Sequence, residues 1–540
     1  MLNGQLSDPG YATHLTQVAS YFDIVDSAVK TADTNKRYSM STNVSTAPSP
    51  PIQANSWTHI HIAPTCDNMC DLYNSYIVAE MEIKVQTVYK GEAANKENAD
   101  NPPSFWVGFK DAMHAISQYQ IISNGVSIYD QSHAMEESYI TSLATPDTVI
   151  ERDVFSKCSM KGIHKRPDCL MTGALIEYGV GPQTIKISLK IDIRRFLPLS
   201  SVKYLPAFVG NLELRIKFST DGLVWCPMPY TDMLINPAKR NLIRTLPPIG
   251  TSFRPLSDEA KILASVGATI NSGNVTQYDF KSALAHLEVQ NMQINKCYSI
   301  LCCFGIDDGI YQSLIQRYSG QSLSFPTQTL SFHQMDGPFT FDAGSNHDRE
   351  GKFNLAITIT PRFVDTIFFL FPHKPNHHTC FYNPMFKEVR LYMGGYGTMP
   401  DQAMTSYGMQ AYEMTQNALN MNNDVMGVNE GVMRSMIVSE NTLETLQLEG
   451  FEANDISNYV LGFPTSLDNT FQQGQTSSSP ITYELKGTFH HNSMFTKQDG
   501  SQCVPIIGLL KDSVLAIQIR PTGPPIVALD EFDIASPSGA

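Results

Sequence analysis

Two groups of histidines and cysteines have a spacing that could hold a metal ion. In HIHIAPTCDNMC, His59 and His61 are two residues apart, and Cys66 and Cys70 follow. Two imidazoles on one face of a strand, with two thiols nearby, can form a tetrahedral zinc site. The C-x3-C spacing differs from the usual zinc knuckle, so we interpret the histidines as a polar strand face beside a loop, with no metal.

A second group lies in PHKPNHHTC, directly after a very apolar run. Its members are His373, His377, His378 and Cys380. We interpret this stretch as an exposed loop that follows a buried strand, again without a metal. No cofactor is expected anywhere in the chain.

Sequence motifs of catalysis are absent from the chain. It contains no HExxH, GxxxxGK[ST] or GxSxG, and no GxGxxG after a strand. Pairs of catalytic carboxylates leave no local signature, so this absence does not exclude every enzyme. The prediction is a protein that is not an enzyme and has no catalytic or cofactor-binding residues.

The charge balance argues against direct nucleic-acid binding. The chain has 38 Lys and Arg against 52 Asp and Glu, a net charge of −14, whereas a nucleic-acid surface is usually basic. We interpret the densest basic cluster, Lys157 to Arg166, as a solvated loop. No apolar window suggests a membrane span, no signal peptide is evident, and ten cysteines do not suggest a disulfide scaffold. Folding in a reducing cytoplasm or nucleus is expected.

Alternation of apolar and polar residues is the strongest structural signal. TIKISLKIDIR and NLELRIKF alternate strictly, and VDTIFFLF is apolar on both faces, as in the middle of a sandwich. The turns Asn124-Gly125 and Gly394-Gly395 follow similar strand patterns about half the chain apart. At 540 residues the chain suits two large domains. The pattern predicts an all-β fold with a β-sandwich in each half, long inserted loops and few short helices.

The predicted organisation has six parts, with long connections at 131–183, 401–480 and 486–512. Helices are expected only in residues 8–30, 110–117, 311–318 and 410–421. The parts are an N-terminal arm (1–54), a first sandwich (55–234), a linker (235–270), a second sandwich (271–525), a loop insertion within it (about 401–480) and a C-terminal tail (526–540).

Two segments are expected to contact other chains. The arm has apolar residues at helical spacing, and 402–436 has seven methionines with almost no charge. Surfaces of this kind are commonly buried by a partner. The predicted arm contacts are Val18, Phe22, Val25 and Val29, and the predicted interface methionines are Met404, Met409, Met414, Met421 and Met426.

The order of these patterns resembles the double jelly-roll major capsid proteins. This hexon-like lineage includes polintons, adintoviruses, virophages, adenovirus hexon and nucleocytoplasmic large DNA viruses. FKDAMHAISQYQIISNGVSIYD is similar to the helix, strand and turn of that family's first jelly roll, and KISLKIDIRRFLPLSSVKYLPAFVGNLELRIKFS to its closing segment. FNLAITITPRFVDTIFFLFPH and YNPMFKEVRLYMGGYGTMPDQ resemble the centre of the second. The similarity covers roughly residues 55–525.

The resemblance implies two consecutive eight-stranded jelly rolls and a structural role in a virion. It implies a homotrimer whose six barrels form a pseudo-hexagonal capsomer of an icosahedral double-stranded DNA virus capsid. The implied partners are other copies, a penton or vertex protein and minor or cement proteins, with an internal membrane left open. The chain would be made in the host cytoplasm or nucleus.

Alternatives remain at this stage. A minor capsid or vertex protein would share the environment, but vertex proteins usually need only one jelly roll. A secreted β-sandwich that binds or cleaves carbohydrate would favour a signal peptide, paired cysteines and tryptophan platforms, whereas the chain has three Trp. A cytosolic enzyme with an unrecognised carboxylate site is the remaining alternative.

Overall fold

The computed structural model is almost entirely β. Within the described residues, no helix is both long and apolar enough to cross a membrane. The structure describes residues 21–25, 39–43, 52–62, 69–90, 104–144, 154–158, 163, 170–177, 181–210, 212–228, 253–271, 274–318, 322–335, 352–394, 397–419, 435, 457–465, 475–477, 479–489, 503–518 and 526–530.

The second half of the chain forms a sandwich in jelly-roll order. One sheet has the order β16-β23-β18-β21 and the other β17-β22-β19-β20. Counted along the chain, these orders are first-eighth-third-sixth and second-seventh-fourth-fifth, the arrangement of a jelly roll. The strands are β16 (Ser322–Gln334), β17 (Lys352–Ile359), β18 (Val364–Leu370), β19 (Phe386–Met393), β20 (Gly397–Met404), β21 (Leu461–Pro464), β22 (Ile481–Phe489) and β23 (Ile506–Gln518).

The first half repeats the key pairings of that order. Its first sandwich strand, β3, pairs with β11, which comes near the end of this half, and β11 also pairs with β6. β4 pairs with β9, and a separate sheet has the order β13-β12-β5-β8. The strands are β3 (Trp57–Ile62), β4 (Met69–Lys90), β5 (Ser104–Gly108), β6 (Ile116–Ser123), β7 (Val126–Gln131), β8 (Gly173–Glu177), β9 (Gln183–Asp192), β10 (Tyr204–Pro206), β11 (Leu212–Phe218), β12 (Val224–Met228) and β13 (Arg254–Pro255). The predicted all-β fold of two consecutive jelly-roll sandwiches is confirmed.

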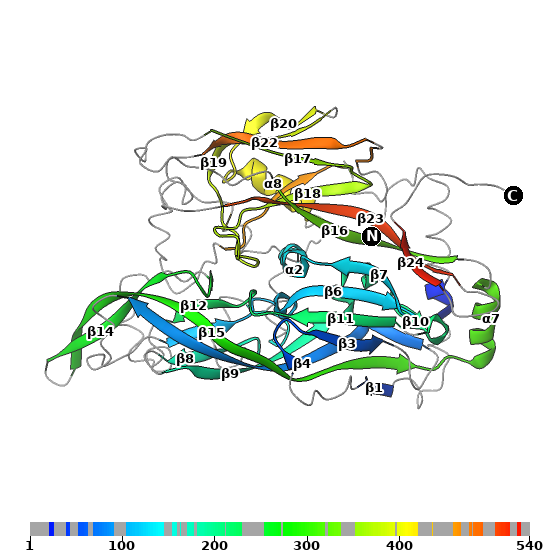
Figure 1. Ribbon diagram of the computed structural model, residues 1–540, viewed down its shortest axis with the longest axis horizontal. Coiled ribbons are helices and arrows are strands. Elements are labelled where there is room, and N and C mark those ends of the chain that lie inside the picture. Colours follow the sequence, from blue (N-terminus) through cyan, green and yellow to red (C-terminus); the bar gives the residue numbers. More distant parts are fainter. Residues whose placement is uncertain are drawn as a thin grey trace.

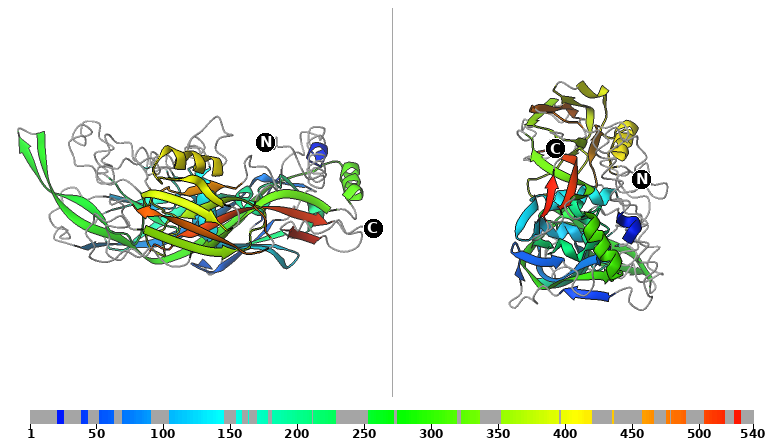
Figure 2. Two further views of the ribbon diagram at one scale, coloured as in Figure 1. Left: turned by 90° about the horizontal axis from the view of Figure 1, so that it is seen from above. Right: turned by 90° about the vertical axis from the view of Figure 1, so that its right-hand side faces the viewer.

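A very long strand joins the two halves. β15 (Asn274–Phe304) pairs with β4 of the first sandwich, and its beginning pairs with β14 (Ala260–Asn271). The β14–β15 ribbon projects from one end of the molecule (Figures 1 and 2). β1 (Ser39–Asn43) and β2 (Ile52–Gln53) pair with β15 as well.

Some strands fall where the sequence analysis placed other parts. β14 lies in the predicted linker, β15 in the predicted second domain although it pairs with β4, and β24 (Ile526–Asp530) in the predicted tail although it pairs with β23. Alternation predicts a strand but does not say which strand it pairs with. The domain boundaries stay predictions.

Both glycine turns close hairpins, but the hairpins are not equivalent. Asn124 and Gly125 have φ values of 48° and 84° and connect β6 to β7. Such a pair of left-handed residues matches the twist of a tight hairpin. β6 lies beside the late strand β11, whereas β19 of the second hairpin lies beside β22. The two hairpins therefore occupy different places in their sandwiches, although their local strand patterns are similar.

Helices are few and short. Residues 21–25 of the predicted arm helix are helical, α7 and α8 match two further predictions, and a 3-10 turn, η4, occupies half of 110–117. α2 was not expected. The helices are α2 (Ala134–Leu143), α7 (Asp308–Tyr318) and α8 (Met409–Ala418), and the 3-10 turns are η4 (Ala112–Ala115), η6 (Ile193–Arg195), η7 (Leu197–Leu199) and η8 (Ala207–Val209).

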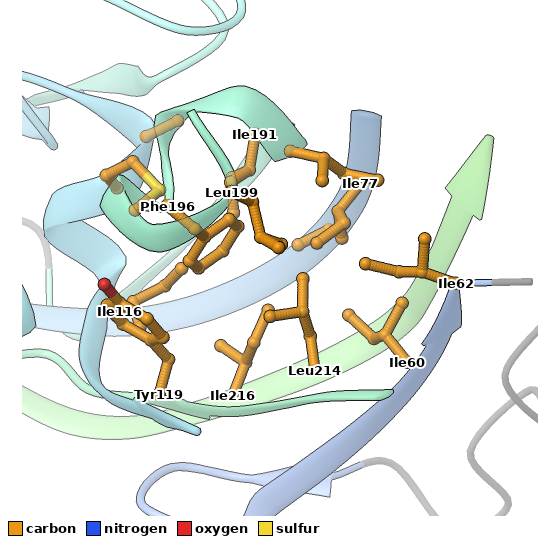
Figure 3. Packing of buried hydrophobic residues seen from close by; sticks show 14 of the residues in the cluster. Ile60, Ile62, Ile77, Ile116, Tyr119, Ile191, Phe196, Leu199, Leu214 and Ile216 are labelled. Atoms are coloured by element: carbon orange, nitrogen blue, oxygen red, sulfur yellow. The ribbon is translucent and has the colours of Figure 1, made fainter. Parts of the chain in front are cut away.

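Aliphatic side chains from the alternating strands fill the first sandwich. Ile60 of β3, Ile77 of β4 and Leu214 of β11 are fully buried and point toward one another (Figure 3). Complete burial of such a side chain contributes about 1.5–3 kcal/mol. The core of the first sandwich also includes Phe325 and Leu515 from the second half. All seven residues of β18 are buried, which confirms its predicted place in the middle of a sandwich.

Candidate assembly surfaces and the junction between the sandwiches

The first histidine and cysteine group does not come together. His59 is exposed on β3, where its Nδ1 contacts the Glu213 carboxylate of β11, and His61 is exposed on the same face. Cys70 is buried on β4 opposite Cys303. The hydrogen bond with Cys303, followed by burial, raises the pKa of the Cys70 thiol, which makes it a poor metal ligand. Cys66 lies outside the described residues.

The second group divides between two neighbours. The His378 Nδ1 is 2.8 Å from Glu136 Oε1 on α2, and Cys380 is buried. His373 and His377 are buried instead beside Asp258, which precedes β14. The interpretation of this stretch as an exposed loop is wrong for these two histidines, because residues from the interdomain segment cover them.

The described part of the arm packs on its own chain. Val25 is buried and Phe22 is half-buried against the core of the first sandwich. Tyr21, which the sequence analysis did not single out, donates a hydrogen bond to the Tyr204 carbonyl at 3.2 Å and meets Phe325 edge to face. Contact of Phe22 and Val25 with another subunit stays a prediction. Val18 and Val29 lie outside the described residues.

The methionines of the predicted interface differ in exposure. Met404, at the end of β20, is buried in the second core, and Met414 packs partly against that core. Met409, the first residue of α8, is 62% exposed. Met409 is therefore the member whose burial by a partner can be detected. Met421 and Met426 lie outside the described residues.

Lys110 connects the two sandwiches. Its ammonium is buried and donates to Ser457 Oγ at 2.6 Å and Asn458 Oδ1 at 3.0 Å. Tyr139 of α2 donates from the same region to the Tyr459 carbonyl at 2.8 Å. Charge-assisted hydrogen bonds of this kind are directional, so they favour one relative placement of the two halves.

An ion pair with Arg195 holds Asp111, the residue next to Lys110. Arg195 of η6 donates two hydrogen bonds to the Asp111 carboxylate, each at 2.6 Å, and Lys157 lies 3.8 Å from it. Burial alone would raise the pKa of Asp111, but the two cations lower it to about 2. Asp111 also accepts from the Met113 amide and caps η4. Lys157 is thus buried, contrary to the interpretation of its segment as a solvated loop.

Helix α2 lies between the sandwiches (Figure 1) and carries two buried glutamates. Glu137 accepts hydrogen bonds from Tyr119 at 2.6 Å and from the Gln131 amide at 2.6 Å. Gln131 also donates to the Leu330 carbonyl of β16. Burial raises the pKa of Glu137 to about 7, because its hydrogen-bond donors are neutral and only partly offset desolvation.

The pKa of the adjacent Glu136 is shifted in the opposite direction. Burial alone would raise the pKa of Glu136, but hydrogen bonds with His133 and His378 lower it to about 2. His378 belongs to the second sandwich and α2 to the first. The junction defined by Lys110, Gln131, Glu136, Glu137 and Tyr139 is thus a polar contact between two apolar cores.

Sequence reasoning missed this junction. Its members are polar residues without a shared spacing, and the partners that cross between the sandwiches are hundreds of residues away, as for Lys110 and Ser457. The one available signal was the pair Glu136-Glu137 within the otherwise uncharged AMEESYITSL.

No protein-family model matches the chain, and no curated protein matches its sequence. Among solved structures, it is similar to a chain of the Sputnik virophage, with 10% identity over 94% of this chain and 90% of that one and a TM-score of 0.47. The mavirus major capsid protein is similar as well, with 9% identity over 91% of this chain and 90% of that one and a TM-score of 0.47.

The Faustovirus major capsid protein is also similar, with 8% identity over 88% of this chain and 90% of that one and a TM-score of 0.41. Identity is at most 10% and each TM-score is below 0.5 in these three matches. The function proposed for the chain therefore rests on its own strand order and contacts.

Proposed function

We propose that this chain is the major capsid protein of a double-stranded DNA virus and forms a pseudo-hexagonal homotrimer that tiles an icosahedral shell. The observation that carries the proposal is the repeated strand order of two consecutive jelly rolls. Three such chains present six similar sandwiches around a threefold axis. A capsomer of this kind has six similar sides while only three chains are needed.

The junction supports the same proposal. A capsomer can present six regular sides only when the two sandwiches of each chain keep a fixed relation. The buried contacts of Lys110, Glu136 and Tyr139 across the halves supply that relation. The role is then geometric, with no chemical step.

The proposed partners follow from this role. The first partner is the chain itself, within the trimer and between neighbouring capsomers, and further partners are a penton or vertex protein and minor or cement proteins. The protein would be located in the virion after synthesis in the host cytoplasm or nucleus. The net charge of −14 speaks against direct sequence-specific contact with the genome.

The mass of the purified protein in solution tests the trimer. We expect about 180 kDa by light scattering, three times the 60.0 kDa of one chain, and a hexagonal outline in negative-stain images of the same peak. Obligate interfaces of this type bury roughly 2,000 Å² or more, so dissociation on dilution should be slow. A stable monomer of 60 kDa with no larger species would count against the proposal.

Met409 provides a local test of the trimer surface. We expect Met409→Lys to weaken trimer formation roughly tenfold or more, because an unpaired ammonium would be buried at the interface. Sedimentation of a dilution series measures the effect. The matched control is Met171→Lys, at a methionine of the first half that is 43% exposed. Equal trimer stability in the two variants would remove Met409 from the interface.

Oxidative labelling gives an independent measure of the same surface. Met409 should react slowly in the trimer and fast in the unfolded chain. Met404, already buried within one chain, serves as the protected reference. Rapid labelling of Met409 in the intact trimer would contradict the assignment.

A further inference from the structure

Asp258, His373 and His377 form a cluster where the segment between the sandwiches meets the second sandwich; both histidines are buried and Asp258 is partly exposed. One ligand atom from each residue lies within 4.8 Å of the other two. His373 and His377 come from the loop after β18, and Asp258 from the turn between β13 and β14. Within the described part of the chain, this is the set of three potential metal ligands that the fold brings together.

The loop that carries the histidines is held in place. Pro372 and Phe381 form a β-bridge at its base, and the His377 amide donates to the Lys374 carbonyl at 3.0 Å. On the other side, the Asp258 amide donates to the Pro255 carbonyl at 3.0 Å. The three side chains are thus presented by backbone that is already fixed, which lowers the ordering cost of binding an ion.

His377 is the residue that most requires a ligand. It is 1% exposed, and its Nδ1 makes no hydrogen bond to the described residues. Its Nε2 contacts Asp258 Oδ1 at 3.3 Å, without the geometry of a good hydrogen bond. A buried imidazole so poorly satisfied is costly, and coordination of a cation between the ring and the carboxylate would offset that cost.

The spacing and chemistry of the donors select the ion. Two ligand atoms at about 2.0–2.2 Å from a tetrahedral zinc ion are separated by roughly 3.3–3.6 Å, and the 3.3 Å between His377 Nε2 and Asp258 Oδ1 lies at the short end of this range. Imidazole donors favour zinc over calcium or magnesium, which prefer oxygen. We propose that Asp258, His373 and His377 bind a zinc ion that ties the interdomain segment to the second sandwich.

Lys374 provides the contrast that makes the site testable. Its ammonium is 2.7 Å from Asp258 Oδ1 and lies on the more exposed side of the cluster. Zinc would compete with this ammonium for the carboxylate. Lys374→Gln should therefore tighten zinc binding, whereas loss of an ordinary salt bridge would only weaken the local structure.

The experiment measures zinc in the full-length protein after dialysis from zinc-containing buffer, by elemental mass spectrometry. We expect about one zinc per chain in the wild type and in His378→Gln, the control at the neighbouring histidine that contacts Glu136, and at least tenfold less in His377→Gln and Asp258→Asn. No retained zinc in the wild type, or equal zinc in His377→Gln, would overturn the proposal.

Cobalt substitution of the wild type keeps the test independent of variants that fail to fold. Co²⁺ bound by these three side chains should give the intense visible absorption of a tetrahedral site, and added Zn²⁺ should abolish that absorption. Lys374→Gln should lower the Co²⁺ concentration needed for half-saturation. A spectrum of hydrated cobalt alone would also refute the site.

Discussion

The interior of the first sandwich and the junction between the two sandwiches are equally buried but chemically opposite. Ile60, Ile77 and Leu214 belong to an interior of apolar side chains, both aliphatic and aromatic (Figure 3), whereas Lys110 and Glu137 place charge or potential charge in the junction. Apolar burial is non-directional and stabilises any compact arrangement. Buried hydrogen bonds are directional and favour one arrangement.

The two regions have different structural roles. Strand alternation alone is sufficient to close each sandwich, because one face of every strand must leave water. It does not determine how one sandwich lies on another. The polar groups of the junction can determine this, because a misplaced partner would leave a buried charge unsatisfied.

The largest expected effect is at the ion pair that supports Lys110. We expect Arg195→Met to lower the free energy of unfolding by about 3–5 kcal/mol, because Asp111 would stay buried with only the more distant Lys157. Denaturant unfolding at fixed protein concentration measures this. The control is Lys186→Met, which breaks the exposed pair with Glu82 and should cost about 0–1 kcal/mol. Similar losses in both variants would show that the Asp111 pair has no special role.

A second prediction separates the two regions by pH. Glu137 has a folded pKa of about 7 against an ordinary value of 4.5. Below pH 4.5 the Glu137 carboxyl is protonated in both the folded and the unfolded chain, so its burial does not change the free energy of unfolding with pH. As the pH rises from the ordinary value of 4.5 to the folded pKa of about 7, the free energy of unfolding falls by about 3 kcal/mol in total. We expect the wild type to lose stability between about pH 4.5 and pH 7 relative to Glu137→Gln.

The measurement is the free energy of unfolding of both proteins at each pH. The difference between the proteins, and not either absolute value, carries the test, because other groups titrate equally in both. Parallel pH profiles would show that Glu137 is ionised or protonated alike in the folded and unfolded chains.

The smallest effect is expected at the direct link between the sandwiches. Lys110→Met should cost about 1–3 kcal/mol, because Ser457 and Asn458 lose a buried donor while the cost of burying the ammonium is also removed. Amide hydrogen exchange should accelerate at 457–459 and stay unchanged in β6 and β11. Uniform acceleration across both regions would mean that the link stabilises the whole chain and not the junction.

Many of the strands and helices could be predicted because each follows from the periodicity of apolar residues within its own segment. Alternation over Ile185–Ile193 predicted β9, although the strand ends at Asp192 and Ile193 begins the 3-10 turn η6. The apolar VDTIFFLF predicted the buried β18, and α7 and α8 followed from their sequence. α2 escaped because its two glutamates look like surface residues. Glu136 is buried beside His378 from a distant segment, and Glu137 beside Tyr119 and Gln131 of the preceding strands, contacts that the helical spacing of α2 does not reveal.

The candidate sites were harder to predict from the sequence than the fold. Met404 and Met409 belong to the same apolar stretch, yet the fold buries the first within its own core and leaves the second exposed. His373 and His377 were noted as possible ligands, but Asp258 lies in a distant segment without alternation. Its carboxylate reaches the histidines only because β13 and β14 bring the chain back to the second sandwich.

Local patterns along the chain are sufficient to indicate an all-β protein of two sandwiches, because each alternating strand must bury one of its faces. The pairing of the strands depends on the folded arrangement, in which β15 lies on β4 and the two glycine hairpins occupy different positions. The folded arrangement also decides which polar groups meet at the junction. Pairing and polar contact join residues far apart in the chain, and their free energy depends on positions in space that local periodicity does not fix.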